Sequence, residues 1–71
     1  MTTFKIYQDG KLTKTFENQD SDFPALKYIQ NNQGQSFDWA TTHGGWTLTY
    51  IDESGQELNY KTDKPHIIKN L

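Results

Sequence analysis

Residues 46–62 read WTLTYIDESGQELNYKT and predict a β-hairpin. Apolar and polar side chains alternate on both sides of a single glycine, which is the period of strands that bury one face. A three-residue loop over residues 53–55, with Gly55 in the left-handed conformation, pairs Tyr50 with Leu58. This register gathers one apolar face, which consists of Trp46, Leu48, Tyr50, Leu58 and Tyr60.

Another hairpin is predicted over residues 3–17, and its register depends on the turn at Asp9-Gly10. A two-residue Asp9-Gly10 turn would pair Tyr7 with Leu12 and would put the apolar residues of the two strands on opposite faces. A three-residue loop that includes Gln8 pairs Ile6 with Leu12 instead. We therefore expect the three-residue loop, because it places on one face Phe4, Ile6, Leu12 and Phe16.

Between the hairpins, residues 22–33 predict an amphipathic helix. Residues 20–22, Asp-Ser-Asp, offer side-chain oxygens that cap a helix start, and Pro24 is tolerated in a first turn. Gly34 is a typical residue for the end of a helix. The expected apolar face consists of Phe23, Leu26 and Ile29.

Residues 36–43 fit either a short helix or a strand. In the strand, Phe37 and Trp39 alternate with polar residues. In the helix, Ser36 caps the N-terminus, Phe37 and Ala40 face inward, and His43 lies in the last turn. Ala40 and the Ser36 cap favour the helix.

These elements predict a small α+β fold, in which an antiparallel sheet of two β-hairpins packs on one face against one or two intervening helices, in the order β-β-α-(α)-β-β. Residues 1–71 are expected to form a single domain. The tail over residues 63–71 contains the apolar residues Ile67, Ile68 and Leu71, which are expected to pack onto the sheet or to contact a partner.

The composition and the apolar segments of the sequence indicate the cellular compartment of the protein. The sequence contains no cysteine, which fits a reducing compartment. Its first residues lack an apolar segment behind a basic start, and no apolar run approaches the roughly 20 residues that span a bilayer. We therefore expect a cytoplasmic protein without a membrane segment.

No arrangement of residues predicts catalysis or a cofactor. Ser36, Asp38 and His43 suggest a hydrolase, but Ser36 and His43 would lie about 10 Å apart along a helix, beyond hydrogen-bonding reach. The two histidines, His43 and His66, have no metal-binding spacing. The glycine pair after His43 is more typical of a turn than of a phosphate-binding loop. We therefore expect no enzyme activity, no metal and no cofactor.

Nucleic-acid binding is the alternative function. The predicted helices around Gly34 have the order of a helix-turn-helix, followed by a hairpin wing. The candidate contacts are Lys5, Tyr7, Lys11, Asn31, Asn32 and Gln35. The net charge of −2 and the absence of arginine disfavour this function. Nucleic acids are negatively charged, and arginine is the side chain that best forms paired hydrogen bonds with phosphates and guanine edges.

Protein binding or self-association is the leading expectation, because aromatic residues make up 14% of the chain and tryptophan anchors many interfaces. The candidate contacts are Phe37, Trp39, Trp46, Ile67 and Ile68. The pattern of residues 35–40 followed by Gly44-Gly45-Trp46 is similar to that of small uncharacterised proteins of Gram-positive bacteria and their phages. That resemblance covers about a third of the chain and implies no activity.

Overall fold

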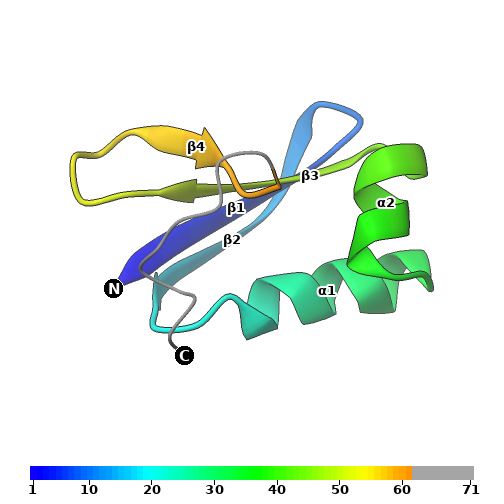
Figure 1. The fold of residues 1–71 in the computed structure, drawn as a ribbon, viewed down its shortest axis with the longest axis horizontal. Coiled ribbons are helices and arrows are strands. Elements are labelled where there is room, and N and C mark those ends of the chain that lie inside the picture. The colour runs from blue at the N-terminus through cyan, green and yellow to red at the C-terminus, as the bar shows by residue number, and fades with distance from the viewer. Residues whose placement is uncertain (62–71) are drawn as a thin grey trace.

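The computed structural model describes residues 1–61, which form four strands and two helices (Figure 1). The elements in chain order are β1 (Thr2–Gln8), β2 (Lys11–Gln19), α1 (Phe23–Gln33), α2 (Phe37–His43), β3 (Trp46–Ile51) and β4 (Glu57–Asn59). The strands make one antiparallel sheet in the order β2-β1-β3-β4. The predicted α+β class is therefore confirmed, and pairing of β1 with β3 joins the two hairpins into one sheet.

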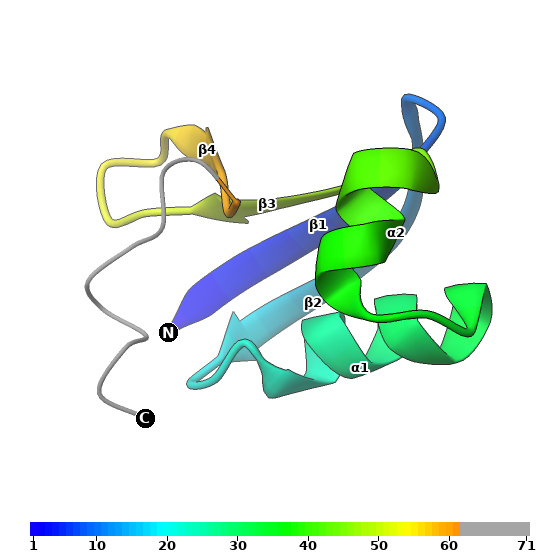
Figure 2. The same cartoon turned by 45° about the vertical axis from the view of Figure 1, so that its right-hand side comes forward.

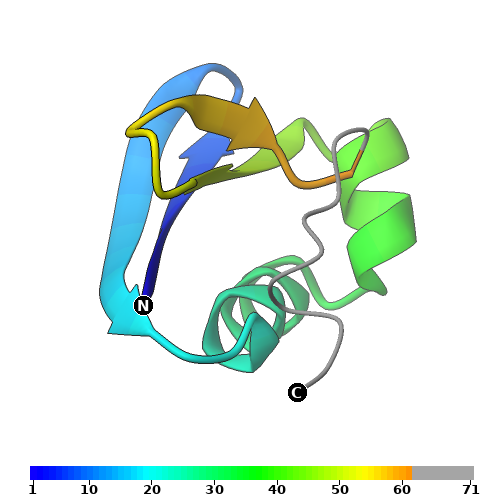
Figure 3. The ribbon, with the colours of Figure 1, turned by 60° about the vertical axis from the view of Figure 1, so that its left-hand side comes forward.

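Both helices lie on the same side of the sheet, and neither covers the other side (Figure 3). Helix α1 runs beneath the sheet, and α2 rises from the end of α1 toward the start of β3 (Figure 2). We call the helix-covered side the inner face and the other side the outer face. Alternate residues of β1 and β3 are buried, as expected for strands with only one face in the core.

The core lies between the inner face and the helices. Aromatic rings from three elements meet there in edge-on contacts, with Phe4, Phe37 and Tyr50 around Tyr60 at centroid distances of 6.3, 5.9 and 6.4 Å. Such edge-on pairs are favourable beyond their buried area. The buried residues of this core are Phe4, Ile6, Ala25, Ile29, Ala40, Trp46, Leu48, Tyr50 and Tyr60.

The second hairpin follows the predicted register. Tyr50 pairs with Leu58, and Gly55 adopts the expected left-handed conformation with φ 87°. The loop closes through the backbone N–H of Asp52, which donates to the Gln56 carbonyl at 3.1 Å. Strand β4 is short, and position 62 of the predicted hairpin lies outside the described residues.

The loop predicted for the first hairpin is wrong. Asp9 and Gly10 both have positive φ, 53° and 82°, so they form the two-residue turn, and Tyr7 pairs with Leu12. One step further, Ile6 pairs with Lys14, which leaves an extra residue in β2. This extra residue is a β-bulge.

The bulge explains why the prediction failed. It reverses the alternation of β2 after Leu12, so that Phe16 returns to the inner face and pairs with Phe4. Leu12 stays on the outer face and is 50% exposed, although it was predicted in the core. A second irregularity in β2 lies near Asn18, whose φ is 57°.

Helix α1 confirms the prediction for residues 22–33, with two differences in detail. The Ser21 hydroxyl, rather than the Asp22 carboxylate, accepts the N–H of Phe23 at the helix start. Ala25 and Ile29 face the sheet, so Phe23 lies about 200° around the helix from Ala25 and is 62% exposed. Phe23 is therefore not a core residue. Gly34 ends the helix with φ 79°.

Residues 37–43 form a helix, so the helical alternative is confirmed. The Ser36 hydroxyl accepts the N–H of Trp39 at 3.2 Å and caps the first turn. Ala40 is buried, and Phe37 packs against the core. In the described part of the chain, no helix is long and apolar enough to cross a bilayer.

Candidate functional site

Helix α2 presents an exposed tryptophan beside a histidine. Trp39 is 40% exposed, and its ring centroid lies 5.6 Å from that of His43, with a tilt of 50° between the rings. The two residues are one helical turn apart, a spacing that brings side chains into contact. Trp39 is thus held against its own helix while part of the indole remains in solvent.

The helical period explains why Trp39 faces outward. Ala40 is buried and Phe37 is half-buried, so these two residues fix the inner side of α2. Trp39 and His43 then lie outside the layer that contacts the sheet. The same burial pattern predicts an outward Trp39 once the helix is assumed, and the role of Trp39 as a contact residue stays a prediction.

Lys61 connects the end of the second hairpin to α2. Its ammonium donates to the Thr42 hydroxyl at 2.5 Å and lies 3.8 Å from a carboxylate oxygen of Asp38. Both charged side chains are exposed, so the ion pair contributes little to stability. We define the α2 surface as Asp38, Trp39, Thr42, His43 and Lys61.

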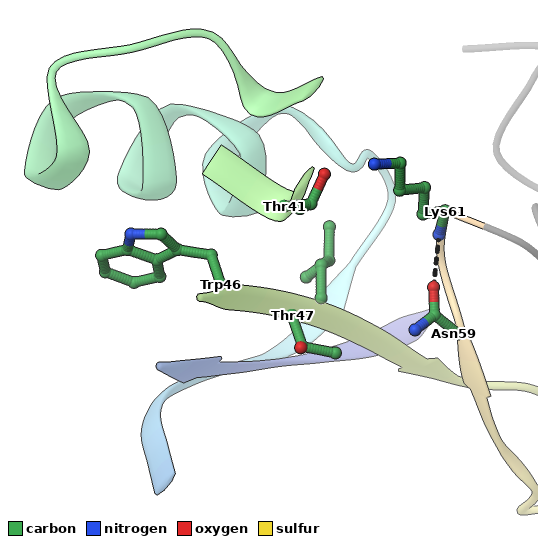
Figure 4. A pocket seen from close by; sticks show the side chains of 6 residues that line it. Thr41, Trp46, Thr47, Asn59 and Lys61 are labelled. Carbon is green, nitrogen blue, oxygen red and sulfur yellow. Dashed lines mark hydrogen bonds between the residues drawn. The ribbon is translucent and has the colours of Figure 1, made fainter. Parts of the chain in front are cut away.

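A small pocket lies behind the α2 surface, between α2 and the first half of β3 (Figure 4). Its volume is about 60 Å³, which is room for water and not for a substrate of ordinary size. Among the described residues, no buried side-chain N or O atom lacks a hydrogen-bond partner. The pocket is lined by Thr41, Trp46, Thr47, Leu48, Asn59 and Lys61.

Trp46 and Phe37 occupy different positions from Trp39. Trp46 is only 4% exposed, and its indole N–H donates to the Gln33 side-chain oxygen at 2.8 Å. Trp46 therefore belongs to the core and offers no contact surface in this fold. Phe37 packs edge-on against Tyr60 and is half-buried. Ile67 and Ile68, the other predicted contacts, lie outside the described residues.

Lys5 and Tyr7, two of the candidate nucleic-acid contacts, lie together on the outer face. The Tyr7 hydroxyl donates to a carboxylate oxygen of Glu57 at 2.7 Å, and the Thr49 hydroxyl donates to the same oxygen at 2.6 Å. These bonds lower the pKa of Glu57, and the nearby positive charge of Lys5 lowers it further. The bond to Glu57 raises the pKa of the Tyr7 hydroxyl. The outer face thus carries a fixed negative charge beside Lys5.

Sequence reasoning missed Glu57. The alternation of side chains along β4 could have placed Glu57 on the outer face, because its neighbour Leu58 was predicted to face inward. What the sequence did not show is that β1 lies beside β3, which brings Tyr7 and Glu57 together across 50 positions.

The remaining nucleic-acid candidates do not join Lys5 and Tyr7. Lys11 is exposed at the start of β2. Asn31 and Asn32 lie at the end of α1, on the opposite side of the sheet, and Gln35 lies in the connection to α2 (Figure 3). The Asn32 amide donates to the Tyr28 carbonyl at 2.8 Å. The six candidates are therefore divided between two sides of the molecule.

Ser36 and His43, two of the residues considered for catalysis, lie at opposite ends of α2. The Ser36 hydroxyl caps that helix. In residues 1–61, no group of three or more His, Asp or Glu side chains could hold a metal ion.

Comparisons with protein families, with curated proteins and with solved structures find no match.

Proposed function

We propose that this chain is a non-enzymatic, cytoplasmic interaction module that binds another protein or a second copy of itself, with Trp39 as the main contact. The supporting observation is that Trp39 remains 40% exposed on a helix whose inward residues already pack into the core. Exposed tryptophans at interfaces commonly carry a large share of the binding energy. Contact with His43 restricts the Trp39 side chain before binding, which lowers the entropy lost on association.

The surroundings of Trp39 distinguish it from the other exposed apolar side chains. Phe23 is more exposed, but the Lys27 ammonium lies 5.7 Å from its ring centroid and partly covers it. Single exposed apolar residues are common on protein surfaces. Trp39, by contrast, precedes Thr42 by three residues on the same helix and follows Asp38 directly, and both of these polar residues contact Lys61. An aromatic centre with a polar rim is the usual composition of a protein interface.

A photo-crosslinking experiment tests the proposal. A photoreactive phenylalanine analogue is placed at position 39 in one variant and at position 23 in a matched control, and each variant is irradiated in living cells. We expect a defined adduct from position 39 alone, and mass spectrometry identifies it as a second copy or as another protein. Equal adducts from both positions, or none from position 39, would refute the proposal.

Weak nucleic-acid binding is the second candidate, supported by the juxtaposition of Lys5 and Tyr7 on the uncovered outer face. Tyrosine can stack on single-stranded bases, and lysine can pair with phosphates. The Glu57 carboxylate opposes binding, so Glu57→Gln should strengthen retention on single-stranded oligonucleotides at low salt. Absence of retention for both proteins at low salt removes this candidate.

A further inference from the structure

The contact between Trp39 and His43 pairs an exposed aromatic ring with the side chain whose charge ordinarily changes near neutral pH. Both side chains are exposed, so protons reach the imidazole directly from solvent. Their centroid distance of 5.6 Å lies within the range in which a cation is attracted to an indole ring. The strength of this contact therefore depends on whether His43 is protonated.

The position of His43 in α2 acts in the same direction. His43 is the last residue of the helix, where carbonyl groups without intrahelical partners create a partial negative charge. A protonated imidazole is favoured at such an end, whereas a neutral imidazole gains little from it. Protonation thus strengthens both the contact with Trp39 and the contact with the helix terminus.

The other charged groups near this end of α2 are two carboxylates, Asp38 and Asp9, and one ammonium, Lys61. Asp38 of α2 lies beside Lys61, which follows β4. Asp9, in the β1–β2 turn, donates its backbone N–H to the Gly45 carbonyl at 2.8 Å, and its carboxylate lies against Gly45. The last residues of α1, the helix that packs against α2, are uncharged, namely Asn31, Asn32 and Gln33.

We propose that Trp39 and His43 form a pH-sensitive switch in which protonation of His43 fixes Trp39 in its contact-ready position. In this tilted contact the indole is still partly exposed, so the fixed state is also the state that would meet a partner. Protonation of His43 therefore strengthens binding through Trp39. This inference rests on the proposed role of Trp39 as a contact residue, but the switch itself is measurable without a partner.

A double-mutant cycle at two pH values tests the switch. The unfolding constants of the wild type, Trp39→Ala, His43→Ala and the double variant are measured in urea at pH 5.5 and pH 8. We expect the Trp39–His43 coupling to change the unfolding constant by roughly two- to fivefold more at pH 5.5 than at pH 8, because the cation–π attraction exists only for the imidazolium. His66→Gln serves as the control, and this difference should persist in that background.

The indole N–H resonances of the wild type give a second measurement. The Trp39 resonance should differ between pH 5.5 and pH 8 in the wild type and not in His43→Ala, and the Trp46 resonance should stay constant because its indole is buried and bonded to Gln33. Equal coupling at both pH values, or a Trp39 resonance that changes with pH as much in His43→Ala as in the wild type, would overturn the switch. Either result would leave the photo-crosslinking test of the proposed function unaffected.

Discussion

At the scale of single residues, Tyr60 connects the end of the second hairpin to the start of α1. Its ring is buried in the core, and its hydroxyl donates to the Asp22 carboxylate. Burial raises the pKa of Tyr60 well above the usual value, and the hydrogen bond to Asp22 and the negative charge of Asp22 raise it further. The stabilisation is therefore fully present below about pH 10 and is lost as the pH rises above that value.

Tyr60→Phe should lower the free energy of unfolding by about 1.5–3 kcal/mol at pH 7, because it removes a hydrogen bond to a charged group and leaves Asp22 without that donor. It should also reduce the loss of stability above pH 10. Urea unfolding at pH 7 and pH 10.5 measures both effects. Tyr28→Phe is the matched control, since Tyr28 is a half-buried tyrosine packed on the same core. A similar cost for both variants would contradict the assignment.

At the scale of elements, β4 has only three residues, and two carboxylates help to hold it. An Asp52 oxygen accepts from the N–H groups of Ser54 and Gln56, at 3.0 and 3.1 Å, and from the Ser54 hydroxyl at 2.6 Å. The bond from the Ser54 hydroxyl is the main cause of the lowered pKa of Asp52. The pKa of Glu57 is also lowered, chiefly by the bond from the Thr49 hydroxyl.

Acid should therefore loosen β4 before the rest of the sheet. Because both folded-state pKa values are lowered, the stabilisation is present above the usual carboxyl pKa of about 4 and is lost as the pH falls below it. We expect faster hydrogen exchange at the amides of Gly55 and Tyr60, relative to those of β1, as the pH falls from 5 to 2.5. The Asp52→Asn, Glu57→Gln double variant should show much less change in this ratio, and an unchanged acid response in that variant would exclude these carboxylates as the cause.

The accuracy of the sequence-based predictions also differed between elements. The three-residue loop at Gly55 and the cap at Ser36 were predictable because short-range geometry determines them. The register of the first hairpin was not, because the bulge in β2 inserts a residue without a glycine to mark it. The dipeptide Asp9-Gly10 is typical of a two-residue turn, and this local prediction was correct. It was set aside because a regular hairpin with that turn would not place all the apolar residues on one face.

At the scale of the whole molecule, one side of the sheet is covered by helices and the other is not, so the cost of truncating a side chain depends on its face. Ile6 is fully buried on the inner face, and Leu12 is half-exposed on the outer face. Ile6→Ala should cost about 2–5 kcal/mol of unfolding free energy, and Leu12→Ala within about 0.5 kcal/mol. Thermal or urea unfolding measures the two values, and a large cost at Leu12 would restore the register predicted from the sequence.

The candidate site was predictable only where its geometry depends on residues that are close together in the sequence. Trp39 could be placed because its neighbours on one short helix fix its direction. The contacts of Lys61 with Thr42 and of Tyr7 with Glu57 join segments 19 and 50 positions apart, and no local pattern reveals which segments meet.

The central pairing of β1 with β3 has a consequence for how the protein is made. Thr3 pairs with Ile51, so β1 leaves the ribosome before α1, α2 and β3, and the sheet cannot be completed until β3 has followed. Closing such a long loop early is entropically unfavourable, so we expect β1 and β3 to pair after the local hairpins and helices have begun to form. During synthesis the apolar side of the first hairpin remains uncovered until α1, α2 and β3 have emerged, and this is the interval in which aggregation would compete with folding.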